Sequence, residues 1–92
     1  MLNQSHQPQF IDLFAGCGGL SLGLMQAGWK GLFAVEKSSM AFDTLKANLI
    51  RKDDSYSYSW PSWLPSEPID IQSILSKYQE RLLEVKGVDL LA

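Results

Sequence analysis

"FIDLFAGCGGLSLGL", residues 10–24, joins an apolar run to a loop of three glycines and one cysteine, and then to a leucine-rich stretch. The run Phe10–Phe14 is short and almost wholly apolar, which is typical of a strand buried on both faces of a parallel sheet. After the loop, Leu20, Leu24 and Ala27 recur at the spacing of one helix face. The stretch therefore predicts a strand, a glycine loop and a helix.

The next segment repeats this order. Gly31–Glu36 is a second short apolar run, and it ends on a single acid. Ser38 or Ser39 can cap a following helix, because a serine hydroxyl accepts a hydrogen bond from a free N–H of the first turn. The apolar stripe of that helix is Phe42, Leu45 and Leu49. Strand, helix, strand and helix in succession indicate a right-handed crossover into a parallel sheet.

Residues 51–68, "RKDDSYSYSWPSWLPSEP", have no regular period and contain three prolines and five serines. A loop of this length is uncommon in a compact domain and predicts an insertion. Its aromatic residues are Tyr56, Tyr58, Trp60 and Trp63. Exposed rings can stack on nucleic-acid bases, but the acidic start of the segment favours packing against the sheet edge or a neighbouring helix.

Apolar residues at helical spacing predict one amphipathic helix over residues 71–85, ended by Gly87. "VDLLA", residues 88–92, then reads as the start of another apolar strand. Because no turn or cap follows that strand, we expect the chain to be a truncated domain, with residues 10–92 forming part of it.

Composition limits the function classes. A chain of 92 residues forms at most one small domain, and a net charge of −2 leaves no basic footprint for nucleic-acid phosphates. A single cysteine excludes an internal disulfide framework. Residues 1–9 read as a flexible polar tail whose His6 has no partner at metal-ligand spacing, so no metal is expected. No apolar run approaches the roughly 20 residues that span a bilayer, so we expect a soluble cytoplasmic protein with no membrane partner.

The glycine loop and Glu36 together predict a ligand site. Gly16, Gly18 and Gly19 let a ligand approach the main chain closely, and the loop opens a helix whose free N–H groups attract anions. Glu36 ends the second strand, where an acid in doubly wound folds reaches a ribose diol. These features describe a pocket for an adenosine-bearing ligand. The same loop and acid keep an NAD- or FAD-type oxidoreductase open as an alternative. Ser21 counts against it, because a dinucleotide fingerprint has glycine at this sixth position.

"FIDLFAGCGGLSLGLMQAGW" and "FAVEKSSMAFDTLKANL" resemble the first two motifs of the DNA (cytosine-5) methyltransferases, and the resemblance resumes at "IDIQSI" and "VDLLA". It implies an α/β fold, the start of a doubly wound Rossmann-like methyltransferase sheet truncated before the catalytic loop. It also implies the cofactor S-adenosyl-L-methionine. Phe14 lies where many other methyltransferases carry an acid.

Carried over residue by residue, the resemblance implies a cofactor site from three segments. Phe14 would pack on the cofactor, and the main chain of Ala15, Gly16, Cys17, Gly18, Gly19 and Leu20 would wrap its methionine part. Glu36 would accept from the ribose hydroxyls, and Lys37 could cover the adenine with its alkyl stem. Asp70 would bind the adenine amino group, with Ile71 on the ring. From the residues alone, Asp70 could equally be an N-cap, and buried Asp12 would organise the loop by accepting from its N–H groups.

Methyl transfer to cytosine C5 needs a thiolate that adds to C6 of a flipped-out base. The resemblance places that cysteine after the strand at Val88, so Cys17 is expected to line the cofactor loop, and no catalytic residue is assigned. We expect a restriction-modification enzyme acting on double-stranded DNA, with these 92 residues inactive alone. A transfer-RNA substrate and a non-catalytic adaptor remain alternatives. A truncated sheet also exposes strand edges, which predicts a dimer or a swapped assembly.

Overall fold

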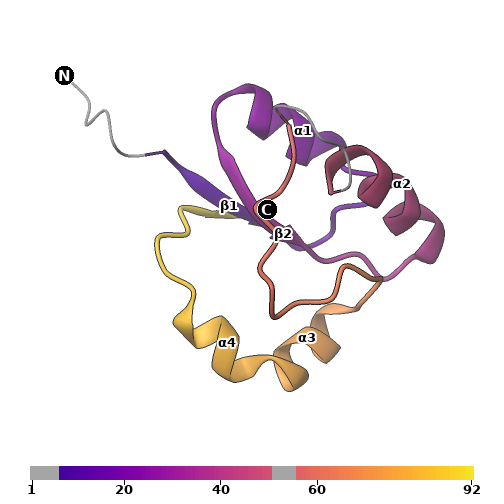
Figure 1. The fold of residues 1–92 in the computed structure, drawn as a ribbon, viewed down its shortest axis with the longest axis vertical. Helices are drawn as coiled ribbons and strands as arrows, with labels where there is room; N and C mark the ends of the chain where they lie inside the picture. Colours follow the sequence, from indigo (N-terminus) through magenta and orange to yellow (C-terminus); the bar gives the residue numbers. More distant parts are fainter. Residues whose placement is uncertain (1–6, 51–55) are drawn as a thin grey trace.

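The computed structural model of the chain describes residues 7–50 and 56–92. Its elements follow in the order β1 (Gln9–Asp12), α1 (Gly19–Gln26), β2 (Lys30–Ala34), α2 (Ser39–Leu49), α3 (Ile71–Lys77), α4 (Gln79–Glu84) and β3 (Leu90–Leu91). Helices α1 and α2 lie on one side of the strands, and α3 and α4 lie on the other (Figure 1). The fold is therefore a small α/β arrangement around a parallel sheet.

The sheet has the order β2-β1-β3, and both pairings are parallel. Phe10 lies opposite Gly31 on one side and opposite Leu90 on the other. A central parallel strand is covered on both faces, which explains why the run that begins at Phe10 is almost wholly apolar. The three predicted strands are confirmed, each shorter than predicted. β1 stops at Asp12 because the chain turns there into the glycine loop.

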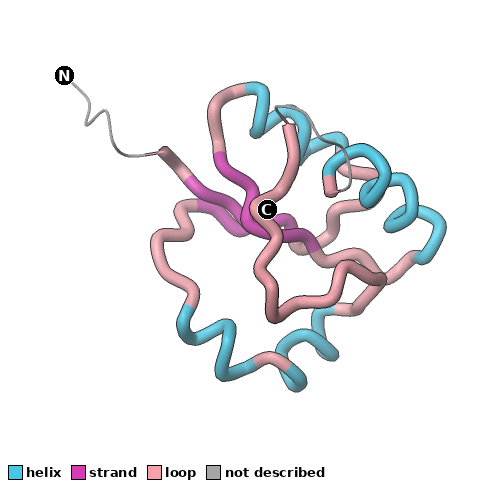
Figure 2. The backbone as a smooth tube through the Cα atoms, viewed as in Figure 1, coloured by secondary structure: helices cyan, strands magenta, loops and turns pink. Residues whose placement is uncertain are grey.

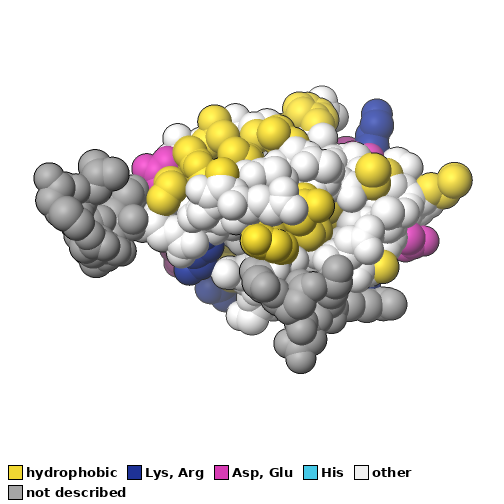
Figure 3. All heavy atoms as spheres, turned by 90° about the horizontal axis from the view of Figure 1, so that it is seen from above, with side chains coloured by type: hydrophobic (Ala, Val, Ile, Leu, Met, Phe, Trp, Pro, Cys, Tyr) yellow, Lys and Arg dark blue, Asp and Glu magenta, His cyan; other side chains and the backbone are white. Residues whose placement is uncertain are grey.

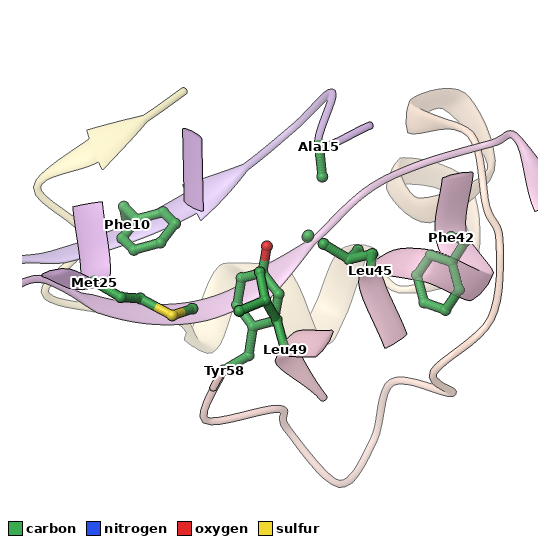
Figure 4. Close-up of a cluster of buried hydrophobic side chains, with 8 residues drawn as sticks. Phe10, Ala15, Met25, Phe42, Leu45, Leu49 and Tyr58 are labelled. Carbon is green, nitrogen blue, oxygen red and sulfur yellow. The ribbon is translucent and has the colours of Figure 1, made fainter. Parts of the chain in front are cut away.

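Two clusters of buried side chains lie on opposite faces of the sheet, since successive strand residues point to opposite sides. Phe10 belongs to the cluster under α1 and α2, and Ile11 belongs to the cluster under α3 and α4. Figure 4 shows the first cluster, which consists of Phe10, Ala15, Met25, Ala34, Phe42, Leu45, Leu49 and Tyr58. The first strand thus anchors both layers of helices.

Helix α2 is as predicted. Ser38 is its N-cap, and the Ser38 hydroxyl accepts from the N–H of Ala41 at 3.3 Å. Its buried residues are Phe42, Leu45 and Leu49.

Helix α1 forms, but the predicted buried face is wrong by one position. Leu20 is 57% exposed, whereas Ser21 and Met25 are buried. The polar Ser21 side chain can face inward because Asp12 accepts its hydroxyl proton. A buried polar group that has a hydrogen-bond partner avoids most of the desolvation cost of burial. A prediction from apolar periodicity takes no account of such a partner.

The single helix predicted over residues 71–85 is also wrong, because the chain breaks at Tyr78 between α3 and α4. Tyr78 has φ −123° and ψ 26°, outside helical values. Its ring lies 5.7 Å from that of Trp63. Ile74 before the break and Leu82 after it both contact the second cluster. The two short helices both stay in contact with the face of the sheet, whereas one straight helix over the same residues would diverge from it.

The segment from Tyr56 to Asp70 has no helix or strand (Figure 2). Three of its aromatic side chains, Tyr58, Trp60 and Trp63, pack in or against the two buried clusters, as favoured from the sequence, whereas Tyr56 is 39% exposed. The Trp60 ring lies 6.3 Å from Phe33 and 6.2 Å from Phe42, and its indole N–H donates to the Leu64 carbonyl at 2.8 Å. Residues 51–55 of the predicted insertion, and residues 1–6 of the predicted tail with His6, lie outside the described residues.

Candidate functional site

A cleft of about 450 Å³ opens beside the carboxyl ends of β1 and β2, a size in the range of small-molecule sites. Three segments far apart in the sequence line it, namely the residues after β1, the residues after β2 and the start of α3. Its lining residues are Leu13, Phe14, Val35, Glu36, Lys37, Ile69, Asp70, Ile71 and Gln72. The structure therefore brings together five predicted site residues, Phe14, Glu36, Lys37, Asp70 and Ile71.

Glu36 joins the glycine loop to the start of α2. One carboxylate oxygen accepts from the N–H of Gly16 at 2.7 Å, and the other accepts from the N–H of Ser38 at 2.9 Å. A carboxylate has about four lone-pair positions, so each oxygen can accept one further hydrogen bond. Glu36 is thus held rigidly while it retains capacity for a ligand with two adjacent hydroxyls.

Phe14 is the apolar element of the cleft mouth. Its side chain is 77% exposed, an uncommon state for a ring with so much apolar area to bury. Val35, Ile69 and Ile71 supply apolar wall in the same cleft. A flat apolar ligand would cover the free surface of Phe14 and gain the corresponding burial energy.

Asp70 caps α3. Its carboxylate accepts from the N–H of Ser73 at 2.7 Å. This hydrogen bond is the largest cause that lowers the pKa of Asp70, and the ammonium of Lys37 contributes as well. The cap role considered from the sequence is therefore present, and the same residue lines the cleft.

The lowered pKa makes a prediction for the acid range. A depressed pKa in the folded state means that the ionised carboxylate stabilises the fold above its ordinary pKa of 3.8, and that this contribution is lost as the pH falls through the lower folded value. We expect wild type to lose urea resistance relative to Asp70→Asn across that range, because asparagine keeps the capping oxygen without the titrating charge.

Urea midpoints at neutral pH and below 3.8 test this expectation. Asp43→Asn, on the exposed face of α2, is the matched control. Parallel pH dependences for wild type and Asp70→Asn would contradict it.

The glycine loop is shaped by its own main chain. The N–H of Ala15 donates to the Val35 carbonyl at 3.1 Å, and that of Gly18 donates to the Ala15 carbonyl at 2.9 Å. Gly18 has φ +99°, and an added Cβ would lie 2.7 Å from methyl carbons of both Leu45 and Leu49. Only glycine fits here without displacing the core.

The remaining predicted residues lie elsewhere on the loop. Cys17, Gly18 and Gly19 line a separate hollow of about 280 Å³, together with Leu22, Thr44, Asn48, Leu49 and Tyr56. Cys17 is exposed, and so is Leu20. The structure therefore separates these residues from the cleft of Glu36 and Asp70, although Gly16 links both through its hydrogen bond to Glu36.

Two sets of residues escaped the sequence reasoning. Leu13, Val35, Ile69 and Gln72 line the cleft; each is one position from a predicted residue, which was the available signal. The hydrogen-bond partner predicted for Asp12 was also wrong. The Asp12 carboxylate accepts from the Ser21 hydroxyl at 2.7 Å instead of from loop N–H groups. The sequence signal for this partner was the polar Ser21 next to apolar residues of the predicted helix.

Comparison with known proteins assigns the family. The model of C-5 cytosine-specific DNA methylases matches residues 8–71. The chain belongs to this family. The matched range contains β1, the glycine loop, Glu36, Asp70 and Ile71, so it includes nearly all of the cleft of this DNA methylase family member.

Relatives are Type II methyltransferases. M.HgiGI of Herpetosiphon aurantiacus is 55% identical over 40 residues, covering 44% of this chain and 32% of the relative. M.PspPI of Psychrobacter sp. (strain TA137) is 50% identical over 44 residues, 48% of this chain and 11% of the relative. M.NgoFVII of Neisseria gonorrhoeae is 38% identical over 47 residues, 51% of this chain and 13% of the relative. Each alignment thus spans less than a third of the relative. No solved structure matches.

Two further findings concern the described residues of this DNA methylase family member. Among residues 7–50 and 56–92, no group of three or more histidine, cysteine, aspartate or glutamate side chains is placed to hold a metal ion. In the same ranges, no helix has the length and apolar character to cross a membrane.

Proposed function

We propose that this chain is the S-adenosyl-L-methionine-binding part of a DNA (cytosine-5) methyltransferase of a restriction-modification system. The observation that carries the proposal is the cleft in which Phe14, Glu36 and Asp70 meet from three separate segments. The family match agrees with a methyl donor as the ligand. In this proposal residues 10–92 are part of the methyltransferase domain, and the three parallel strands begin its doubly wound, Rossmann-like sheet.

The adenosine half of the donor suits the cleft. The adenine ring would lie between Phe14 and Ile71, where it would cover exposed apolar surface. The Asp70 carboxylate would accept from the adenine amino group, and the oxygens of Glu36 from the two ribose hydroxyls. Lys37 would lie along the ring edge with its ammonium in water.

The methionine half suits the glycine loop. Residues 15–20 turn back at Gly16 and Gly18, both with positive φ, and lead into the first turn of α1. The free N–H groups of that turn favour a carboxylate. The donor would supply an electrophilic methyl group on its sulfonium. The exposed Cys17 is proposed to be part of this loop and not the nucleophile, so the 92 residues alone would bind the donor without transferring its methyl group.

Double-stranded DNA is the proposed substrate of the whole protein, because the family is named for DNA methylases and the relatives are named Type II methyltransferases. Lysine and arginine side chains are sparse on the face shown in Figure 3, and the net charge is −2. Affinity for DNA depends largely on basic groups that neutralise phosphates. We therefore assign donor binding, and not the main DNA contacts, to the described residues.

Calorimetric titration with S-adenosylhomocysteine tests the proposal on the 92-residue protein. We expect saturable 1:1 binding, and competition by adenosine. NADH is the comparison ligand, because a dinucleotide site would also use the glycine loop and an acid. Binding of NADH without binding of S-adenosylhomocysteine would overturn the proposal in favour of an oxidoreductase-type site, and binding of neither would overturn both.

A further inference from the structure

Asp12, Ser21 and Tyr58 form a buried chain of hydrogen bonds that the proposed site does not use. Their relative exposures are 2%, 0% and 7%. The Ser21 hydroxyl donates to the Asp12 carboxylate at 2.7 Å, and the Tyr58 hydroxyl donates to Ser21 Oγ at 2.5 Å. The three residues come from β1, α1 and the aromatic segment after α2, so the chain ties three parts of the fold together.

The direction of donation in this chain is fixed. A serine hydroxyl has one proton, and Ser21 gives it to Asp12. Tyr58 must therefore be the donor in the second bond. Burial raises the pKa of Tyr58, and the nearby Asp12 carboxylate adds to this effect, so the phenol keeps the proton that it donates. Phenylalanine at position 58 would remove this donor and keep the ring.

The chain of hydrogen bonds joins the two ends of the glycine loop. Asp12 is the last residue of β1, and Ser21 lies in the first turn of α1. All the loop residues proposed to wrap the methionine half lie between these two positions. A hydrogen bond across the loop ends restricts the loop to fewer conformations before a ligand arrives, and such preorganisation favours binding.

Tyr58 is itself held firmly. Its N–H donates to the Leu49 carbonyl at 2.9 Å, and the next N–H, of Ser59, donates to the Gly31 carbonyl at 2.8 Å. The ring fits against Gly31, where an added Cβ would lie 2.8 Å from a ring carbon of Tyr58. In Figure 4 the Tyr58 ring lies beside Leu49, with its hydroxyl pointing away from the segment that carries it. The phenol is thus a fixed donor, built into the core.

We propose that Tyr58 is a positioning residue for the methyl donor: through Ser21 and Asp12 it holds the glycine loop in the shape that receives the methionine half. This inference rests on the proposed function. It gives the aromatic segment a role in cofactor binding through the loop, although the Tyr58 ring itself packs in the core. Because the adenosine half is proposed to contact Glu36 and Asp70 instead, Tyr58 acts mainly on binding of the methionine half.

The experiment compares two ligands on Tyr58→Phe and wild type in the 92-residue protein. Affinity for S-adenosylhomocysteine, measured by calorimetry, should fall about fivefold in the variant, the size of one net hydrogen bond. Affinity for adenosine, measured by ligand-observed NMR, should stay within about twofold. Tyr78→Phe removes the hydroxyl of a partly buried tyrosine on the opposite face of the sheet, and it is the matched control for both ligands.

Ser21→Ala provides a second variant, because it interrupts the same chain without changing any residue of the aromatic segment. It should show the same selective loss for S-adenosylhomocysteine. Equal losses for both ligands, or no loss in Tyr58→Phe while wild type binds normally, would overturn this inference and leave the proposed function standing. Failure of wild type to bind S-adenosylhomocysteine at all would instead overturn the proposed function. A urea midpoint for each variant confirms that binding is measured on folded protein.

Discussion

Gly18→Ala is expected to lower the free energy of unfolding by about 2 to 4 kcal/mol. Two costs add at this position. The backbone has φ +99°, which an alanine adopts only with strain, and the new Cβ would lie 2.7 Å from methyl carbons of Leu45 and Leu49. Those leucines are buried, so they can yield only by disturbing the cluster around Phe42. For a domain of this size such a loss is a large part of the total stability.

Urea denaturation followed by tryptophan fluorescence measures the effect. Gly19→Ala is the matched control, because Gly19 has no atom within 4 Å of an added Cβ and its φ is not positive. We expect the control to change stability by less than about 1 kcal/mol, since alanine favours a helix start no less than glycine does. Similar losses in the two variants would contradict this account of the glycine loop.

Glu36→Ala is expected to weaken binding of S-adenosylhomocysteine at least about thirtyfold, corresponding to about 2 kcal/mol. The substitution removes the proposed ribose acceptor. It also leaves the N–H groups of Gly16 and Ser38 without the carboxylate that now accepts from them. The ligand would therefore lose a direct contact and meet a less ordered loop. Calorimetric titration of both proteins measures the change.

Two variants sharpen this measurement. Glu36→Gln keeps one acceptor oxygen but replaces the other by an amide group that cannot accept, so one of the hydrogen bonds from Gly16 and Ser38 is lost. Its affinity should fall between those of Glu36→Ala and wild type. Glu80→Gln on α4 removes an exposed carboxylate far from the cleft, and it should bind like wild type. Unchanged affinity in Glu36→Ala would remove Glu36 from the proposed site.

The strands, helix α2 and the main residues of the cleft could be predicted because each depends on a local signal. Phe10 begins a short apolar run that ends in glycines, and Ser38 precedes an apolar stripe. Glu36 comes just after β2, at the carboxyl edge of a parallel sheet, and Asp70 comes just before the apolar stripe of a helix, at its N-cap position. Topology then brings these positions together, and the family resemblance indicated what kind of ligand they would share.

The features that could not be predicted depend on contacts between distant segments. Ser21 faces inward because Asp12 and Tyr58 satisfy its hydroxyl, and periodicity contains no information about that partner. The break at Tyr78 allows Ile74 and Leu82 to contact the same cluster, whereas spacing alone favours a continuous helix. Both cases are tertiary contacts that override local propensity.

The two hydrogen bonds that Glu36 accepts have a thermodynamic consequence. One carboxylate holds the loop at Gly16 and is proposed to receive the sugar, so loop order and sugar recognition are linked equilibria. By reciprocity, the free energy that an ordered loop adds to binding of the sugar equals the free energy that a bound sugar adds to ordering of the loop. Discrimination between ribose and 2′-deoxyribose would then vary with loop stability, and substitutions that never touch the ligand could change it.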